Sequence, residues 1–227
     1  MGSLLYSPEK MDSEKYLDGL SERIDQLRIQ LKNADPSSLA MRTGANYRLK
    51  KPGTGEFLLP LWGQEILVTY PGLIAFDTQT REELPAYLQA LLLYYFNTCD
   101  AISAGGHWIS FSELPDGRFY NQAFQGYTGQ KLSKAFQNDL QSFELVAQNL
   151  GGQSELRAAT ISIGDAAYAF QVLPKVSILV VYWLGDEDFP ASCQLLFDAS
   201  VSHCLPTDAC AIIGSTLTHR LIAKGGR

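Results

Sequence analysis

The chain has 227 residues, of which 46% are apolar and 19% are charged, and its formal net charge at pH 7 is −6. This composition excludes a disordered chain and leaves ample apolar material for a core. The acidic balance argues against nucleic acid as a partner, because a basic patch supplies most of the affinity in such complexes.

A chain of this length lies near the upper limit of what one hydrophobic core serves. We therefore expect an N-terminal amphipathic helix and linker over residues 1–34 and a single domain over residues 35–227, with two compact domains as the less favoured alternative. The longest apolar runs, residues 90–96 and 176–184, are too short for a membrane-spanning helix. Residues 1–13 lack the pattern of a signal peptide, so we expect a cytoplasmic protein.

The first predicted element is a long helix over residues 7–33. Its apolar residues recur at steps of three and four: Leu17, Leu20, Ile24, Leu27 and Leu31. We expect this apolar stripe to pack on the protein's own core; a homodimer or a docking partner joined through residues 7–33 is the alternative. Pro36 ends the helix, and a linker is expected over residues 33–38.

Short β-rich runs follow at residues 46–50, 56–59, 65–70 and 73–77, and Pro and Gly between them indicate an antiparallel meander. The basic residues Arg42, Arg48, Lys50 and Lys51 fit a solvated hairpin edge. Residues 81–99 are apolar around most of a helix, which predicts a buried helix.

The second half of the chain predicts a helix over residues 129–150, strands at 158–163, 166–173, 177–183 and 193–197, and a closing helix over residues 207–224. Strands and helices do not alternate in βαβ fashion. The expected fold is therefore α+β, a mixed and mainly antiparallel sheet packed with three or four helices.

Four cysteines are present: Cys99, Cys193, Cys204 and Cys210. They form no Cys-x-x-Cys pair, and their neighbours are apolar. We expect buried free thiols rather than disulfides.

The densest group of potentially functional residues lies at residues 105–120. The pair Gly105–Gly106 lets backbone approach a ligand closely, and His107, Glu113 and Arg118 supply an acid, a base and an anion contact. The alternative is purely structural, a strand at residues 108–111 followed by a Leu-Pro-Asp-Gly turn. No phosphate-binding loop follows the two glycines.

Two further groups are weaker candidates. Asp186, Glu187 and Asp188 have the ligand chemistry of a calcium or magnesium site, but consecutive carboxylates converge poorly, and an acidic turn is favoured. The set His203, Cys204, Cys210 and His219 lacks zinc spacing, so no metal is expected. A nucleophile pair of Cys204 with its neighbour His203 is weaker still.

Several motifs in order carry a family resemblance: Gly-Gly-x-Trp-Ile-Ser-Phe-x-Glu-Leu-Pro-x-Gly at 105–117, Gly-Asp-x-x-Tyr-x-Phe at 164–170, Trp-Leu-Gly-Asp-Glu-Asp-Phe-Pro-Ala at 183–191, and Leu-Leu-Phe-Asp at 195–198. The chain resembles a bacterial and archaeal family, the domain of unknown function numbered thirty-seven eighty-six, over about residues 35–223. Some relatives look to be joined to iron–sulfur segments and associated with corrinoid or one-carbon metabolism, which implies a tetrapyrrole or corrinoid cofactor. This chain has no ferredoxin-like cysteine motif, which argues against an iron–sulfur cluster.

The leading functional hypothesis is a non-catalytic binding or accessory protein. It would hold a cofactor or a partner on an aromatic, Gly-rich surface that comprises Gly105, Gly106, Trp108, Phe111, Tyr120, Trp183 and Asp186. An enzyme using His107, Glu113 and Arg118 is one alternative. An assembly factor that docks through the N-terminal helix is the other.

Overall fold

The computed structural model describes residues 13–100, 105–155 and 164–225. The described residues gather into two compact units. Unit 1 takes those of Met1–Ser103 with Leu173–Lys175 and His203–Ala209, and unit 2 takes those of Ala104–Val172, Val176–Ser202 and Cys210–Arg227. The boundary between the two units near residue 103 does not test the predicted division of the chain at residue 34, which stays a prediction.

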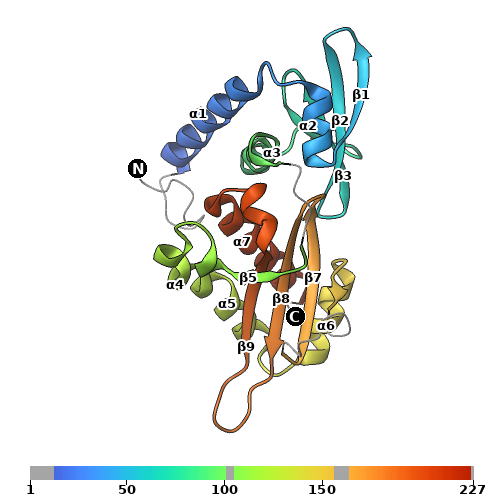
Figure 1. Ribbon diagram of the computed structural model, residues 1–227. Coiled ribbons are helices and arrows are strands. Elements are labelled where there is room, and N and C mark those ends of the chain that lie inside the picture. The colour runs from blue at the N-terminus through green and yellow to red at the C-terminus, as the bar shows by residue number, and fades with distance from the viewer. Residues whose placement is uncertain (1–12, 101–104, 156–163, 226–227) are drawn as a thin grey trace. The chain divides into compact units, whose positions relative to one another are not determined.

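In unit 1 the predicted N-terminal helix is α1 (Ser13–Leu31), which packs against α3 (Ala86–Thr98) (Figure 1). Four residues of its apolar stripe are buried: Leu20, Ile24, Leu27 and Leu31. The expectation that this stripe packs on the protein's own core is confirmed for these positions. Residues 7–12 of the predicted helix lie outside the described residues.

The expected linker is wrong from Pro36 onward, where the chain forms α2 (Pro36–Thr43). The Asp35 carboxylate accepts a hydrogen bond from the backbone N of Ser38 at 2.7 Å, which caps the helix. Pro36 occupies the first helical position, where its missing N–H costs nothing. Gly44, at φ 69°, ends α2 in the left-handed conformation.

The predicted meander is confirmed as a four-stranded antiparallel sheet of β1 (Asn46–Lys51), β2 (Thr54–Leu61), β3 (Gln64–Tyr70) and β4 (Ala75–Asp77), in that order. Phe57 of β2 lies opposite Val68 of β3, and both are buried. The Phe57 ring meets that of Phe96 in α3 at 4.9 Å between centroids, so this face of the sheet packs on the helix. Lys50 of the exposed β1 edge pairs with Glu56 at 2.9 Å.

Unit 2 has its own sheet, with the order β5-β9-β8-β7-β6. The strands are β5 (Trp108–Ser110), β6 (Gln153–Ser154), β7 (Ala166–Leu173), β8 (Val176–Trp183) and β9 (Ser192–Asp198). Helix α6 (Leu140–Asn149) covers one face, where the Phe143 ring contacts those of Tyr168 and Tyr182. The predicted strand at 158–163 lies outside the described residues.

The single helix expected over residues 129–150 is wrong, because it is broken into α5 (Gly129–Phe136) and α6. Gln137 adopts φ 51°, and Asp139 then caps α6 by accepting a hydrogen bond from the backbone N of Ser142 at 2.9 Å. Helix α4 (Gly117–Tyr127), which follows the short helix η1 (Phe111–Glu113), has no counterpart in the sequence prediction.

The short helix η2 (Ala199–His203) precedes the closing helix α7 (Thr207–Gly225), which agrees with the predicted helix at 207–224. Both described sheets are antiparallel in the pairings with a defined register, so the α+β class is confirmed. All four cysteines are buried free thiols, as expected. None of the helices in the described part of the chain has the length and apolar character to cross a membrane.

Candidate functional site

The glycine pair that precedes β5 is tied to a buried carboxylate in unit 2. Asp198, which is 2% exposed, accepts a hydrogen bond from Gly106 N at 2.8 Å and one from Gly105 N at 3.3 Å. Ser200 donates to the same carboxylate from its backbone N at 2.9 Å and from its hydroxyl at 2.6 Å. The open backbone expected at Gly105–Gly106 therefore already holds an internal anion.

Asp198 is ionised in this environment. Burial alone would raise the pKa of Asp198, but the hydrogen bonds from Ser200 and from the two glycine amides outweigh burial and hold this pKa below its usual value. The sequence analysis did not single out Asp198. The signal that would have found it is Asp198-Ala199-Ser200, because Asp residues commonly bind backbone and hydroxyl groups two positions later.

Glu113 serves as a structural cap of η1. Its Oε2 accepts hydrogen bonds from the backbone N of Ser110 and from the Ser110 hydroxyl, both at 2.7 Å. These two bonds, backbone first, lower the pKa of Glu113, and the charge of His107 acts in the same direction. A carboxylate engaged in this way is a poor general base.

The other two members of the predicted catalytic set are exposed. His107 lies just before β5, and its carbonyl accepts a hydrogen bond from Ala199 N at 2.8 Å. Arg118 lies in the first turn of α4. His107 thus lies close enough to affect the pKa of Glu113, whereas Arg118 lies on a separate element.

Trp108 and Trp183 share one apolar surface on the sheet of unit 2. A buried cluster of Ala167, Leu179 and Val181 forms its centre, and Trp108, Ala169, Trp183 and Leu196 pack against this cluster. Both indoles are half-buried. We call these seven residues the tryptophan face. Of the predicted aromatic surface, Trp108 and Trp183 belong to this face, and both are partly exposed.

Phe111 does not belong to that surface. It is 1% exposed and stacks on Phe124 of α4, with ring centroids 4.1 Å apart and planes at 8°. Tyr120 of α4 is 39% exposed and its neighbour Phe119 is 85% exposed. Residues 108–117 form the strand β5, the short helix η1 and a turn before α4. This is close to the structural alternative of a strand followed by a turn.

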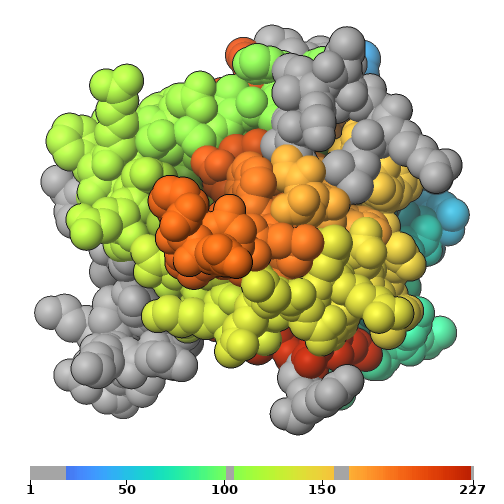
Figure 2. Space-filling model, turned by 90° about the horizontal axis from the view of Figure 1, so that it is seen from below, coloured from blue at the N-terminus to red at the C-terminus, as the bar shows by residue number. Residues whose placement is uncertain are grey.

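Asp186 organises the loop between β8 and β9. Its carboxylate accepts hydrogen bonds from the backbone N of Asp188 at 2.9 Å and of Phe189 at 2.8 Å, which makes a local turn. Gly185 N donates to the Asn138 side chain at 2.8 Å and fastens the loop to the α5–α6 connection. Figure 2 shows this loop, in orange, on the face toward the viewer.

The soft ligands His203, Cys204, Cys210 and His219 are divided between the units, the first two in unit 1 and the last two in unit 2. Within the ranges that the structure describes, no three His, Cys, Asp or Glu side chains have the arrangement of a metal site.

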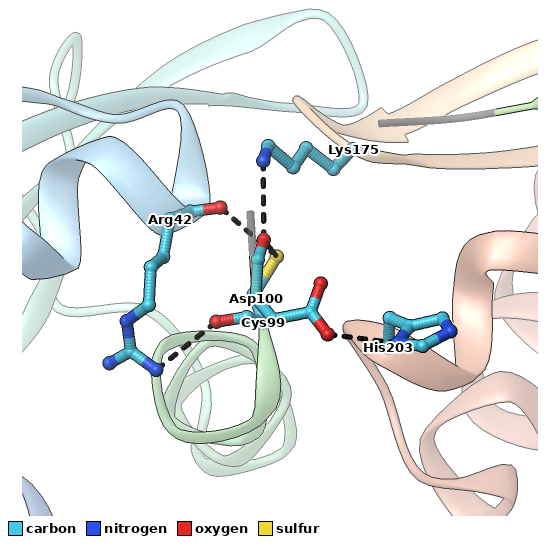
Figure 3. A network of polar contacts seen from close by, with 5 residues as sticks. All are labelled: Arg42, Cys99, Asp100, Lys175 and His203. Atoms are coloured by element: carbon cyan, nitrogen blue, oxygen red, sulfur yellow. Dashed lines mark hydrogen bonds and ion pairs between the residues drawn. The ribbon is translucent and has the colours of Figure 1, made fainter. Parts of the chain in front are cut away.

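Unit 1 contains a polar network that the sequence analysis missed (Figure 3). Asp100 pairs with His203, with Oδ2 and Nδ1 2.8 Å apart, and Asp100 N donates to the His203 carbonyl at 3.1 Å. Lys175 Nζ donates to the Asp100 carbonyl at 3.2 Å, and Arg42 Nη1 donates to the Cys99 carbonyl at 3.2 Å. No sequence signal joins these residues, because they come from four separate segments.

Cys99 of this network also interacts with Cys204. The Cys204 thiol donates a hydrogen bond to the Cys99 sulfur and thereby lowers the pKa of Cys99, which burial alone would raise. The same interaction, with burial, raises the pKa of Cys204. Tyr95 gives its one hydroxyl proton to the Thr43 carbonyl at 2.6 Å, which leaves Cys204 as the donor to Cys99.

A family model described as a domain of unknown function, DUF3786, matches residues 35–220. The match begins at the Asp35 cap of α2, and it confirms the resemblance drawn from the sequence motifs. Comparison with the curated proteins gives no match, and neither does comparison with the solved structures.

Proposed function

We propose that this chain, which belongs to the DUF3786 family of domains of unknown function, is a non-catalytic binding or accessory protein that holds a flat cofactor of tetrapyrrole or corrinoid type on the tryptophan face. The observation that supports this proposal is that the half-buried indole of Trp108 packs, together with Leu196, against one apolar cluster. Indole faces stack on flat conjugated rings, and an apolar floor supplies the remaining contact area.

The alternative of an enzyme that uses the residues around Gly105 and Glu113 has less support than the binding proposal. Glu113 is occupied by Ser110, and the amides of Gly105 and Gly106 are occupied by Asp198. An oxyanion hole or a general base needs such groups to be free for the substrate. Binding of a ligand without catalysis requires only that part of the tryptophan face is exposed.

The register of β9 supports one position for a flat ligand over another. Trp108 lies opposite Asp198 and Trp183 lies opposite Ser192, so the indoles belong to opposite ends of β9. Six residues of strand correspond to about 20 Å, and Leu196 projects on the same face as Asp198 and Ser192. We therefore place the ligand on Trp108 and Leu196, with Trp183 beyond its far edge.

The test is a titration of the purified chain with hemin and with cobinamide, each followed by quenching of tryptophan fluorescence and by the ligand's absorption spectrum. The chain has three tryptophans, so a Trp62→Phe background leaves only Trp108 and Trp183 as reporters. In that background we expect Trp108→Ala to weaken binding by roughly tenfold, as loss of one stacked ring does. Trp183→Ala should weaken it less.

Phe119→Ala is the matched control, because Phe119 is an aromatic residue that is 85% exposed and lies outside the tryptophan face. It should leave affinity unchanged. Equal affinity of the Trp108→Ala variant and its parent, or no binding of either macrocycle, would sink the proposal.

Two finer expectations stay predictions. A docking or dimerisation role for residues 7–33 would have to use positions other than the buried stripe, such as Ile29, which is 71% exposed. A cytoplasmic location is supported by the four buried free thiols, since cysteines in oxidising compartments are mostly paired.

A further inference from the structure

Two cysteines that are 105 positions apart face each other in unit 1. Asp100 N donates to the His203 carbonyl, and the side chains of the same two residues form an ion pair at 2.8 Å. Cys99 precedes Asp100 and Cys204 follows His203, so this double contact brings the segments that carry the two cysteines together.

The side chains of the two cysteines interact with each other, and both are buried: Cys99 is 0% and Cys204 is 1% exposed. The ion pair above them is more open, with 44% of the Asp100 side chain and 45% of the His203 side chain exposed. The pair Asp100–His203 therefore lies on the solvent side of the two sulfur atoms. Local opening of this contact would expose the thiols to solvent.

The surroundings of Cys99 lower the pKa of its thiol. The Cys204 hydrogen bond is the largest influence and lowers this pKa, burial raises it, and the charges of Lys175 and Asp100 lower and raise it by smaller amounts. The Cys99 sulfur also lies 3.4 Å from the Arg42 carbonyl and 3.7 Å from the Asp100 carbonyl, contacts that suit the protonated thiol. The net effect is a pKa of Cys99 below that of an ordinary thiol, which makes the thiolate, the form that attacks electrophiles, easier to reach.

We propose that Cys99 and Cys204 are a redox-active pair that hydrogen peroxide converts to an intramolecular disulfide, with Cys99 as the attacking residue. The Cys99 thiolate attacks one peroxide oxygen, the O–O bond breaks, and the departing hydroxide becomes water. Cys99 is then a sulfenic acid. The Cys204 sulfur attacks Cys99, the S–O bond breaks, and the Cys204 proton leaves with the hydroxide as a second water molecule.

This reaction transfers two electrons from the two thiols to peroxide, and a dithiol reductant reverses it. The pair lies in unit 1 and the tryptophan face in unit 2, so the redox proposal stands independently of the binding proposal. Cys193 is the contrasting thiol in this chain: burial raises its pKa to about 12, so at neutral pH it stays protonated.

The test is peptide mapping of the full chain after treatment with hydrogen peroxide under native conditions, blocking of remaining thiols and digestion with a protease that cleaves before aspartate. Cleavage before Asp77, Asp100, Asp188, Asp198 and Asp208 places the four cysteines on four separate peptides. We expect residues 77–99 and 198–207 to be joined, with a mass lower by two hydrogen atoms than the sum of the reduced peptides. Prior addition of dithiothreitol should remove the product.

Variants then assign the order of attack. Cys204→Ala should leave Cys99 as a sulfenic acid that dimedone traps, whereas Cys99→Ala should leave Cys204 without a dimedone adduct. Cys193→Ala is the matched control and should form the 77–99 to 198–207 product as the wild type does. Peptide mapping of the wild-type chain tests the disulfide even if one of these variants fails to fold.

Joined peptides that contain Cys193 or Cys210 in place of this pair would overturn the proposal. So would a wild-type chain whose Cys99 and Cys204 both remain blocked as free thiols after peroxide treatment. Dimedone labelling of Cys204 in the Cys99→Ala variant would overturn the assignment of Cys99 as the attacking residue.

Discussion

Asp198 holds Gly106 in place through a 2.8 Å hydrogen bond from the glycine amide to a carboxylate 92 residues further along the chain. Gly106 has φ 65°, and the bond fixes this left-handed turn directly before β5 begins. Trp108 then lies opposite Asp198 in the β5–β9 pairing. The position of this indole on the sheet thus depends on an internal anion that the sequence motif around the two glycines does not contain.

Replacement of Asp198 by Asn should lower the free energy of unfolding by about 1.5–3 kcal/mol, the range for hydrogen bonds to a charged group. The folded pKa of Asp198 is lower than its unfolded value, so the stabilisation is complete above the unfolded pKa of about 3.9 and is lost as pH falls through the folded pKa. Urea unfolding of both proteins between pH 7 and pH 2 measures this difference, which should shrink toward low pH. Asp186→Asn, in an exposed turn, is the control.

Gly117 and Gly126 lie in the same helix, α4, and should respond oppositely to alanine. A Cβ at Gly117 would meet the Phe111 carbonyl oxygen at 1.9 Å, whereas a Cβ at Gly126 meets nothing within 4 Å. We expect Gly117→Ala to destabilise by roughly 1–3 kcal/mol through overpacking. Gly126→Ala should stabilise by about 0.5–1 kcal/mol, because alanine loses less backbone entropy in a helix. Thermal unfolding of the two variants decides, and equal effects would contradict the close approach of η1 to α4.

Patterns within one segment were sufficient to predict most elements. The leucine spacing of α1, the Pro–Gly turns of the first sheet and the apolar runs of β7 and β8 each reflect a single local preference. Helix α2 was not predicted, because a proline that ends one helix can also begin the next: Asp35-Pro36 is a cap followed by a first-turn proline.

The break between α5 and α6 shows what a local pattern cannot reveal. Apolar spacing continues from Leu132 to Val146, but Gln137 adopts a positive φ, and its carbonyl accepts a hydrogen bond from the Tyr182 hydroxyl. A strand distant in sequence thus stabilises the break. For the same reason no local pattern reveals the bond between Gly106 and Asp198 or the pairing of Cys99 with Cys204, whose members lie about a hundred residues apart.

The packing of α1 on α3 predicts unequal effects at two neighbouring apolar positions. Leu27 is 0% exposed and Ile29 is 71% exposed. Leu27→Ala should destabilise unit 1 by about 2–5 kcal/mol, since it leaves a cavity. Ile29→Ala should change stability by less than about 0.5 kcal/mol. Chemical denaturation measures both, with light scattering to monitor mass; if Ile29→Ala lowers the mass of an oligomer, this exposed side of α1 is an interface between copies.

The two best-defined thiols should ionise in different pH ranges. The Cys204 hydrogen bond lowers the pKa of Cys99 below that of an ordinary thiol, and burial raises the pKa of Cys193 to about 12. A pH titration followed by the ultraviolet absorbance of the thiolate should therefore lose its earliest step in Cys99→Ala and keep it in Cys193→Ala. Cys204→Ala should shift the Cys99 step to higher pH, because the thiolate loses the donor that stabilises it. Lys175→Met should shift the same step in the same direction by a smaller amount, since the ammonium charge contributes less than the hydrogen bond. If the earliest step survives in Cys99→Ala, the thiolate that forms first belongs to another cysteine, and Cys99 is not the attacking residue.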